Sequence, residues 1–404
     1  MNVVEINAHI FGSGSSIMLG ICDSLREKGH RVLICYPACR TNLKKIVKDS
    51  YLMRTRFERK ISKCLSRWFG LDHLVFRLPT WRLIRRMDRF GVDLVHVHCL
   101  HDWYINIPML FKYLRKNSIP VVWTMHDCWP LTGGCTNFVL SNCSKWQSNC
   151  SGCPQLSGYL ENRFDFTARQ FRVKQKYVSG NPNLTMVAPS EWMASLARQS
   201  YLKNSSIVVV NNGIDTDVFC PTESDFRSRW HLEGKIILLG VAMPWRIGKG
   251  PDVFIRLANE LDDRFCIVMV GTDENIDKTL PDNIVSIHRT FDRTELATIY
   301  SAADLFVNPT LQENFPTVNM EALACGTPVL TYNTGGSPET IDQTCGCVVD
   351  KGDYDSLKAE ILRITRDRPF SSEDCRKRAM QLSFTNMQEA YIDLFKDCIA
   401  KARS

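Results

Sequence analysis

The chain has 404 residues, of which 44% are hydrophobic and 23% are charged, and its formal net charge is +7. This length exceeds one ordinary domain core and predicts two domains, and the composition excludes a disordered or fibrous protein. The first residues lack the basic start and apolar core of a signal peptide, and no apolar run reaches the roughly 20 residues that a membrane-spanning helix needs. We therefore expect a cytoplasmic protein, whose 17 cysteines are thiols or metal ligands rather than disulfides.

The chain begins with an apolar segment that leads into a glycine turn. Val3–Ile6 reads as a strand, and Gly12-Ser13-Gly14 stands in the turn after it. Apolar residues then recur at helical spacing from Ile17 to Leu25, which predicts a helix before the next strand, Arg31–Cys35. Because glycine lets the backbone approach a ligand closely, Gly12 and Gly14 are candidates for ligand contact, and a plain turn is the alternative.

A basic segment follows between Arg40 and Arg89, with fifteen lysine and arginine residues against four acidic residues. Aromatic and aliphatic side chains are interleaved with the charges, as in Phe57–Ile61 and Leu65–Phe69. This mixture is typical of contact with an anionic membrane surface, of nucleic-acid binding, or of ordinary solvated helices. Because no nucleic-acid-binding motif accompanies the charge, we expect no nucleic-acid partner, and the other two interpretations stay open.

The next strand, Asp93–His98, belongs to a stretch with three histidines, His96, His98 and His101. Side chains alternate along a strand, so His96 and His98 share one face. The favoured interpretation is a wall of hydrogen-bonding groups that faces a ligand, and a metal site is the alternative.

The strand Pro120–Thr124 ends just before His126 and Asp127. In a parallel sheet, ligands bind beyond the carboxyl ends of the strands, so both side chains are candidates for ligand contact. A hydrogen-bonded structural histidine is the alternative for His126.

Four cysteines, Cys135, Cys143, Cys150 and Cys153, lie in the nineteen residues that come soon after. Cys150 and Cys153 have the spacing of one half of a zinc knuckle, whereas Cys135 and Cys143 are further apart than in a standard site. Two interpretations stay open: a structural zinc ion held by four thiolates, or free thiols in a long loop.

Strands continue to alternate with helices up to a final amphipathic helix, Asn386–Ala402. The remaining expected strands are Leu184–Val187, Ile207–Val210, Lys235–Leu239, Cys266–Val270, Leu305–Val307 and Pro328–Leu330. This alternation predicts an α/β protein with two Rossmann-like domains, each a parallel sheet with helices on both faces. We place the first domain at residues 1–215, with 386–404 returning to it, and the second at 216–385.

A basic loop, Arg246-Ile247-Gly248-Lys249-Gly250, follows the first strand of the second domain. Arg246 and Lys249 can neutralise a phosphate bound at the carboxyl end of that strand. The alternative is a basic loop that simply begins a helix at Gly250.

Two glutamates, Glu313 and Glu321, stand eight positions apart, just after the strand Leu305–Val307. We expect Glu313 in a turn and Glu321 about two turns into the following helix, whose free N–H groups suit a phosphate or a sugar oxygen. The alternative is an ordinary turn with one exposed and one capping glutamate. Two Asp-x-Asp motifs, at 215–217 and 353–355, do not follow strands of a nucleotide-binding unit, so we expect no catalytic metal site.

The Glu-x7-Glu spacing, with Ala324-Cys325-Gly326-Thr327-Pro328-Val329 after it, resembles the signature of retaining glycosyltransferases of family 4. The resemblance runs from the Gly12 loop to the glutamate pair and is close to bacterial capsule, exopolysaccharide, lipopolysaccharide and colanic-acid-type transferases. It implies the GT-B fold, in which two Rossmann-like domains face one another across a cleft and the last helix crosses back to the first domain.

The resemblance also assigns roles to the candidate residues. The implied catalytic residues are Glu313 and His126; the donor-binding residues are Gly12, Gly14, Arg246, Lys249, Asn314, Phe315, Thr317 and Glu321; and the acceptor-side residues are His98, His101 and Asp127. Two positions depart from the family pattern. Arg246 precedes Lys249 by three positions instead of about five, and Pro316 replaces a glycine, which removes one N–H that could face the donor.

The implied activity is transfer of a sugar, with retention of configuration and without a catalytic metal ion or cofactor, from a nucleoside diphosphate sugar. The expected acceptor is a growing, lipid-linked oligosaccharide of a surface polysaccharide, reached by peripheral contact with the inner face of the membrane. The alternatives are a small soluble acceptor, or a non-catalytic protein that binds nucleotide sugars.

Overall fold

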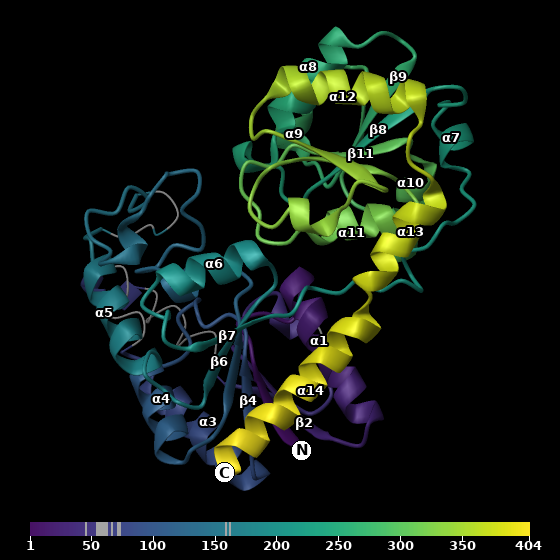
Figure 1. Cartoon of the computed structure of the whole chain (residues 1–404). Coiled ribbons are helices and arrows are strands. Elements are labelled where there is room, and N and C mark those ends of the chain that lie inside the picture. Colours follow the sequence, from purple (N-terminus) through teal and green to yellow (C-terminus); the bar gives the residue numbers. More distant parts are fainter. Residues whose placement is uncertain (45–46, 54–63, 66–67, 71–73, 158–159, 161–162) are drawn as a thin grey trace. The chain divides into compact units, whose positions relative to one another are not determined.

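The computed structural model describes residues 1–44, 47–53, 64–65, 68–70, 74–157, 160 and 163–404. Phe57–Ile61 and residues 66–67 of the basic segment therefore lie outside the described residues. The chain forms two compact units, each an α/β domain: unit 1 is Met1–Asn211 with Gln388–Ser404, and unit 2 is Asn212–Met387 (Figure 1). The sequence-based boundaries, 215 and 385, lie four and two residues from these limits.

Unit 1 is built on a seven-stranded parallel sheet with the strand order β3-β2-β1-β4-β5-β6-β7. Its strands are β1 (Asn2–Ile6), β2 (Arg31–Tyr36), β3 (Ser50–Leu52), β4 (Leu94–Val97), β5 (Val121–Thr124), β6 (Leu184–Ala188) and β7 (Ser206–Val209). The central strands are almost entirely buried, as expected for a parallel sheet covered on both faces. The order reverses between β1 and β4, where such sheets bind ligands.

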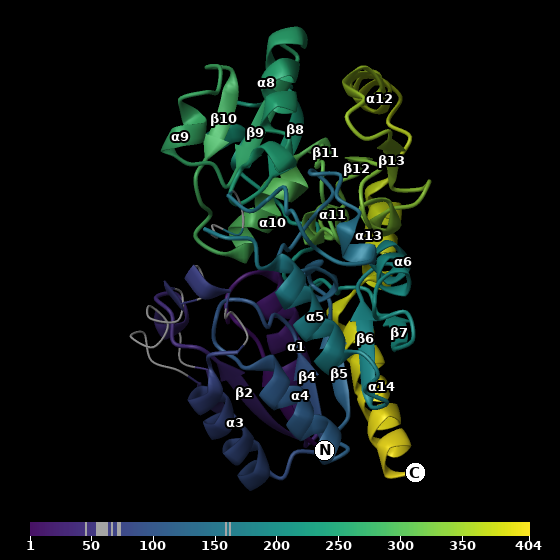
Figure 2. The ribbon, with the colours of Figure 1, turned by 90° about the vertical axis from the view of Figure 1, so that its left-hand side faces the viewer.

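Helices cover both faces of the unit 1 sheet, with α3, α4 and α5 on one side and α1 and α14 on the other (Figures 1 and 2). The helices are α1 (Ser13–Glu27), α3 (Arg77–Phe90), α4 (Ile107–Lys116), α5 (Thr167–Val178), α6 (Glu191–Gln199) and α14 (Phe384–Arg403), with short 3-10 turns η1 (Asn42–Lys44), η2 (Trp129–Leu131) and η3 (Lys145–Gln147).

The final helix, α14, packs against unit 1, as predicted. The Gln388 side chain donates to the backbone oxygen of Gly20 (2.9 Å), and the hydroxyl of Tyr391 lies 2.8 Å from that of Thr124 on β5. Near the end of the helix, Arg403 pairs with Asp93. The helix thus covers a face of the sheet, and its contact with Thr124 joins residues 267 positions apart.

Unit 2 repeats the architecture with a six-stranded parallel sheet in the order β10-β9-β8-β11-β12-β13. Its strands are β8 (Ile236–Val241), β9 (Phe265–Val270), β10 (Ile284–Ile287), β11 (Leu305–Asn308), β12 (Val329–Tyr332) and β13 (Gly346–Val349). Its helices and 3-10 turns are α7 (Phe226–Arg229), η4 (Ile247–Lys249), α8 (Pro251–Glu260), α9 (Glu274–Asp277), α10 (Arg293–Ala302), α11 (Thr317–Ala324), η5 (Pro338–Thr340), α12 (Tyr354–Asp367) and α13 (Ser372–Gln381).

Alternate side chains of the unit 2 strands enter two hydrophobic cores. Ile237 and Leu239 pack in the core with α10, α11 and α13, whereas Leu238 packs in the core with α8 and α12. Both faces of each central strand are therefore apolar, which explains the continuous hydrophobic runs in the sequence.

All the strands expected from the sequence are present, and three strands were not expected. These are β3, β10 and β13, and each lies at an edge of its sheet. Edge strands are short and covered less completely, so their sequences carry a weaker hydrophobic signal.

Among the residues that the structure describes, no helix has both the length and the apolar character that a membrane crossing requires. The two Rossmann-like units match the predicted fold class, and their placement on opposite sides of a cleft stays a prediction.

Candidate active site

In unit 2, the structure brings Lys249 and Glu313 into direct contact. Lys249 ends η4, which follows β8, and Glu313 lies in the turn after β11; these two strands are parallel neighbours, so their carboxyl ends lie side by side. The Nζ of Lys249 is 2.5 Å from Oε2 of Glu313. The side chains are 36% and 18% exposed, so the pair remains accessible to a ligand.

Backbone contacts hold these two loops together. The backbone oxygen of Gly248 accepts hydrogen bonds from the Leu311 N–H (2.9 Å) and the Thr310 hydroxyl (3.1 Å). Gly250 has a φ of +69°, and a Cβ there would lie 2.6 Å from the backbone oxygen of Pro309. Only glycine fits at this position, and its close approach places Lys249 beside Glu313.

Arg246, the second predicted cation of this loop, does not join the pair. Its side chain is exposed, and the described residues supply no ion-pair partner within 4.0 Å of it. The three-residue spacing therefore directs only Lys249 toward Glu313.

Helix α11 begins at Thr317, so Glu321 lies about one turn into the helix. The sequence-based expectation of about two turns was wrong. Glu321 accepts a hydrogen bond from the buried hydroxyl of Tyr300 (3.0 Å), and burial raises the pKa of the Glu321 carboxyl. Pro316 precedes the helix in an extended conformation, and the first N–H groups of α11 have no acceptor within the helix.

Asn314 and Phe315 are the two predicted donor-binding residues just before this helix, and Asn314 contributes through its backbone. The Phe315 ring is only 4% exposed and packs in the core, so its side chain does not contact a ligand. The Asn314 backbone N–H donates to Oε1 of Glu313 (3.2 Å), and the Asn314 backbone oxygen accepts from the Gly336 N–H (3.0 Å). The turn thus fixes the Glu313 carboxylate from its own backbone.

A buried polar network, which the sequence analysis missed, holds the start of α11. The Asn319 oxygen accepts from the Asn308 amide at the end of β11 (2.8 Å), and the Asn319 amide donates to Ser337 (3.2 Å) and Thr340 (2.9 Å). Asn319 is fully buried. An asparagine in the first turn of an otherwise apolar helix is the signal that could have revealed this network.

In unit 1, Gly14 packs against His126. Gly12 is the N-cap of α1, with a φ of +95°, and Gly14 lies in the first helical turn and not in the preceding loop. A Cβ on Gly14 would lie 3.2 Å from Cγ of His126. The N-terminus of α1 and the imidazole at the end of β5 are therefore neighbours, as their predicted roles require.

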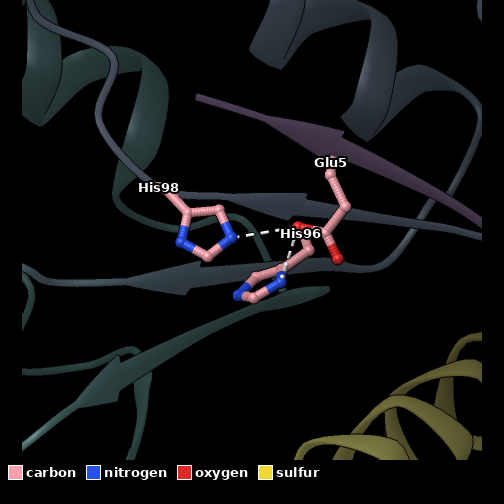
Figure 3. A group of neighbouring side chains, drawn as sticks. All are labelled: Glu5, His96 and His98. Atoms are coloured by element: carbon pink, nitrogen blue, oxygen red, sulfur yellow. Dashed lines mark hydrogen bonds and ion pairs between the residues drawn. The ribbon is translucent and has the colours of Figure 1, made fainter. Parts of the chain in front are cut away.

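A buried cluster of Glu5, His96 and His98 (Figure 3) contacts His126 through His98. Glu5 is on β1, in register with His96 on the adjacent β4. Its Oε2 lies 2.9 Å from Nε2 of His98 and 2.9 Å from Nδ1 of His96. The shared face of His96 and His98 was predicted correctly, but His98 is only 2% exposed and cannot form part of an acceptor-facing wall.

The cluster determines which nitrogen of His126 carries a proton. A carboxylate only accepts, so Nε2 of His98 donates to Glu5, and neutral His98 then accepts at Nδ1. That nitrogen lies 2.7 Å from Nε2 of His126, which must be the donor. Neutral His126 therefore keeps a lone pair on Nδ1, which can accept a hydrogen bond from a hydroxyl group.

Burial keeps these histidines neutral. It lowers the pKa of His98 to about 4 and that of His126 well below its ordinary value. Burial acts to raise the pKa of Glu5, but the contacts with His96 and His98 outweigh it and bring this pKa to about 2. The carboxylate is therefore charged and the two imidazoles are uncharged near neutral pH.

His101, in the loop after β4, and Asp127, just after β5, form a partly exposed pair. Nε2 of His101 lies 3.2 Å from Oδ2 of Asp127, whose other oxygen accepts from the Trp129 N–H (2.8 Å). Both side chains are more than 20% exposed, which is compatible with the predicted acceptor contact.

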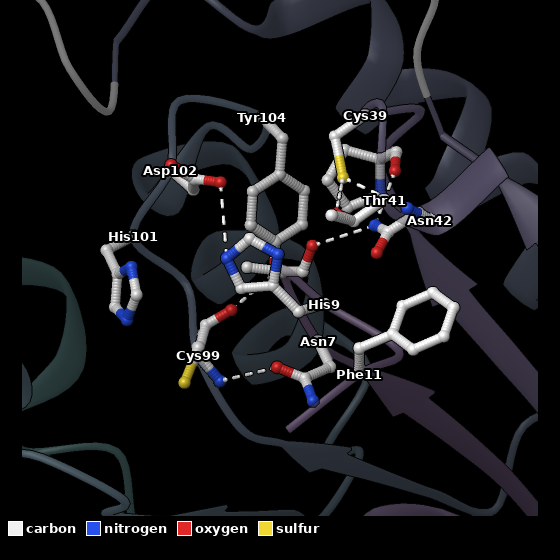
Figure 4. A network of polar contacts seen from close by, with 12 residues as sticks. Asn7, His9, Phe11, Cys39, Thr41, Asn42, Cys99, His101, Asp102 and Tyr104 are labelled. Atoms are coloured by element: carbon white, nitrogen blue, oxygen red, sulfur yellow. Dashed lines mark hydrogen bonds and ion pairs between the residues drawn. The ribbon is translucent and has the colours of Figure 1, made fainter. Parts of the chain in front are cut away.

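Contacts with the segment after β1 fix the same loop (Figure 4). The Cys99 N–H donates to Asn7 (3.3 Å), and the Tyr104 hydroxyl donates to the Cys99 backbone oxygen (2.6 Å). His9 pairs with Asp102 (3.4 Å), whose φ is +88°. A non-glycine residue in this conformation is strained, and such strain clusters at functional sites.

The Asp-x-Asp motifs have structural partners. Asp353 caps α12 by accepting from the Ser356 N–H (3.0 Å), and Asp215 pairs with Arg293 (3.3 Å). The four cysteines, Cys135, Cys143, Cys150 and Cys153, line one small cavity.

The chain is similar in sequence to known glycosyltransferases. It is 24% identical over 417 residues to the colanic acid biosynthesis glycosyl transferase WcaC of Escherichia coli K12. This alignment covers 98% of this chain and 100% of the relative. It is 30% identical over 220 residues to the D-inositol 3-phosphate glycosyltransferase of Mycolicibacterium smegmatis, which covers 50% of this chain and 49% of that one.

Solved structures share the fold across almost the whole chain. A glycosyltransferase from Rickettsia africae has a TM-score of 0.71 at 16% identity and covers 98% of both chains. Anabaena Alr3699/HepE in complex with UDP-glucose has a TM-score of 0.69 at 13% identity and covers 98% of this chain and 100% of that one. A family model described as Glycosyl transferases group 1 matches residues 223–382. The model described as Glycosyltransferase Family 4 matches residues 15–218, half of the chain, so the protein belongs to this family and is a glycosyltransferase with the GT-B fold.

Proposed function

We propose that the protein transfers a sugar from a nucleoside diphosphate sugar to a growing, lipid-linked oligosaccharide of a surface polysaccharide. In this proposal the anomeric configuration is retained and no catalytic metal ion takes part. The contact between Lys249 and Glu313, beside the N-terminus of α11, is the observation that carries the proposal. The similarity to a colanic acid biosynthesis transferase supports a polysaccharide product.

Donor binding would exchange the partner of Lys249. Without a ligand, the carboxylate of Glu313 neutralises the ammonium group. A diphosphate carries more negative charge, so it takes the place of Glu313 beside Lys249, supported by the N–H groups at the start of α11. Glu313 is then released to accept hydrogen bonds from the sugar, and Glu321 accepts from the ribose. Complexes of Anabaena HepE with UDP and UDP-glucose support a nucleotide sugar as donor.

The chemistry would use charges that these residues supply. Departure of the diphosphate leaves positive charge near the anomeric carbon, which the carboxylate of Glu313 stabilises. Lys249 offsets the charge that grows on the leaving group. The acceptor hydroxyl attacks from the side of the leaving group and gives its proton to a phosphate oxygen, which retains the configuration. His126 would accept a hydrogen bond from a sugar hydroxyl at Nδ1.

Peripheral contact with an anionic membrane is supported by the outer face of α3, which combines cations with exposed apolar side chains. Leu78 is 50% exposed and Trp81 is 46% exposed. The exposed arginines of this helix are Arg77, Arg82, Arg85, Arg86 and Arg89. Such a face fits the surface of the membrane that holds a lipid-linked acceptor.

A thermal-shift panel of nucleoside diphosphates and their sugars tests donor binding, because a ligand that binds the native state raises the melting temperature. We expect one nucleotide series to give a shift that Lys249→Met reduces. The absence of any shift across the panel would contradict the proposal. With the donor identified, NMR of the product reports its anomeric configuration, and an inverted product would refute retention.

Sedimentation with vesicles distinguishes a lipid-linked acceptor from a small soluble one. We expect retention on vesicles with anionic lipid, loss of retention in Arg82→Glu/Arg86→Glu, and no change in Arg366→Glu, an exposed arginine of α12. Equal sedimentation of all three proteins would favour the soluble acceptor.

A further inference from the structure

The described residues between β5 and α5, which are 125–157, 160 and 163–166, form a long connection with little regular structure. Its only described elements are the 3-10 turns η2 and η3. Connections longer than about 15 residues rarely stay ordered unless something holds them in place. This connection begins beside His126, so its order bears on the candidate site.

Four cysteines of this connection, Cys135, Cys143, Cys150 and Cys153, line a single cavity of about 20 Å³, which has room for roughly one water molecule. None of them forms a disulfide. They come from separate parts of the connection: Cys135 follows η2, Cys143 precedes η3, and Cys150 and Cys153 follow it. The fold therefore brings all four cysteines of the motif to the wall of one cavity.

The surrounding backbone is arranged to face the sulfur atoms. The Gly133 N–H donates to Sγ of Cys150 at 3.1 Å, and the Gln155 N–H donates to Cys153. A Cβ on Gly133 would lie 2.5 Å from the backbone oxygen of Thr167 and 2.8 Å from Cβ of Cys150, so only glycine allows this contact. N–H donors of this kind orient thiolate ligands and stabilise their charge.

The turn between Cys150 and Cys153 is also shaped to bring both sulfur atoms to the cavity. Gly152 has a φ of +55°, a left-handed conformation that glycine adopts without strain. Nζ of Lys145, on η3, donates to the Gly152 backbone oxygen at 2.6 Å. The turn is therefore fixed by a second part of the same connection.

The geometry points to a structural zinc ion bound by the thiolates of Cys135, Cys143, Cys150 and Cys153. Four sulfur ligands at tetrahedral positions are typical of structural zinc, with Zn–S bonds of about 2.3 Å. No three of these four sulfur atoms, all from described residues, lie within 4.8 Å of one another. The sulfur atoms must therefore move closer together when the ion binds. Binding would then stabilise the connection by linking residues on both sides of η3.

Metal analysis of the full chain, purified without added metal, tests this site. We expect about one equivalent of zinc in the native protein and less than about half an equivalent in Cys143→Ser and in Cys153→Ser. Cys220→Ser is the matched control, because Cys220 is a partly exposed thiol of unit 2; it should keep the full zinc content. Less than about a tenth of an equivalent in the native protein, or full zinc content in both serine variants, would overturn the proposal.

A second measurement needs no variant and remains decisive if the serine variants do not fold. Titration of the native protein with a mercurial thiol reagent should release zinc to a chromogenic chelator. Limited proteolysis before and after release should show new cleavage within residues 125–166. Zinc release without new cleavage in this connection would overturn the structural role, and thiol modification without zinc release would overturn the site.

Discussion

The two units have the same strand order up to one extra strand, but they place their carboxylates differently. In unit 1, Glu5 lies within a central strand, is inaccessible to solvent, and has two histidines as partners. In unit 2, Glu313 lies beyond the end of a strand, is partly exposed, and has a partly exposed lysine side chain as its partner. The first carboxylate therefore organises neighbouring groups, whereas the second can exchange its partner for a ligand.

The largest expected effect is on catalysis by Glu313. In Glu313→Gln we expect nucleoside diphosphate release to slow by about 100-fold to 1000-fold, because a neutral amide cannot offset positive charge at the anomeric carbon. Steady-state assays with the identified donor measure this change. Glu373→Gln, at an exposed position of α13, is the control and should change the rate less than twofold. Unchanged turnover in Glu313→Gln would refute the role of Glu313 in the chemistry, and donor binding without measurable turnover in the native protein would favour the non-catalytic alternative.

Loss of Glu5 should mainly affect stability. Glu5→Leu leaves the N–H of His98 without an acceptor, and removal of one partner from a buried charged cluster costs about 3 kcal/mol. For a unit of this size, we expect the melting temperature to fall by roughly 6 to 12 °C. Glu5→Gln should cost much less, because its amide oxygen can accept from His98. Equal melting temperatures for the two variants would show that the hydrogen bond is unimportant.

Lys249 should affect donor affinity more than Arg246 does. We expect Lys249→Met to weaken binding of the nucleoside diphosphate by about 10-fold to 100-fold, the usual value of one or two charge-assisted contacts. Arg246→Met should weaken it by about threefold or less, because this side chain is exposed and forms no ion pair with the described residues. Calorimetric titration measures both affinities. A larger effect at Arg246 would mean that donor binding rearranges the loop.

The smallest expected effect concerns acid stability of unit 1. The folded pKa of His98, about 4, lies below its ordinary value of 6.5, so the native state binds fewer protons than the unfolded state. This contribution to stability is complete above about pH 6.5 and is lost as the pH falls toward 4. Between pH 7 and 5.5 the loss from His98 is about 1 kcal/mol, or a few degrees in melting temperature.

Three other histidines of unit 1 change the total but not the difference that His98 makes. Burial lowers the pKa of His30 and of His126, and both shifts act in the same direction as that of His98. For His101, burial lowers the pKa, but Cys99 and Asp127 outweigh it and raise the pKa, so its contribution has the opposite sign. The melting temperatures of His98→Gln and of the native protein, compared across this pH range, isolate the contribution of His98. The glutamine amide can still donate to Glu5 and accept from His126. An identical pH dependence in both proteins would refute the assignment.

The sequence predicted the interior strands of both sheets and missed strands at the edges. Interior strands such as β8 are apolar on both faces and stand out as continuous hydrophobic runs, whereas β3, β10 and β13 are short edge strands. The position of Glu321 was wrong by one turn, because the helix begins only after Pro316. Local sequence gives the existence of an element more reliably than its first residue.

The same division applies to the site. The sequence by itself determined two Rossmann-like domains, the Glu313 turn after a strand, and the basic loop that carries Lys249, because each depends on residues that are near one another in the chain. Only the tertiary structure decided that Lys249 and not Arg246 contacts Glu313, and that His98 contacts His126. It also decided that Glu5, through His98, determines which nitrogen of His126 carries a proton. These contacts join residues 28 to 93 positions apart, and their geometry follows from which strands are neighbours in a sheet.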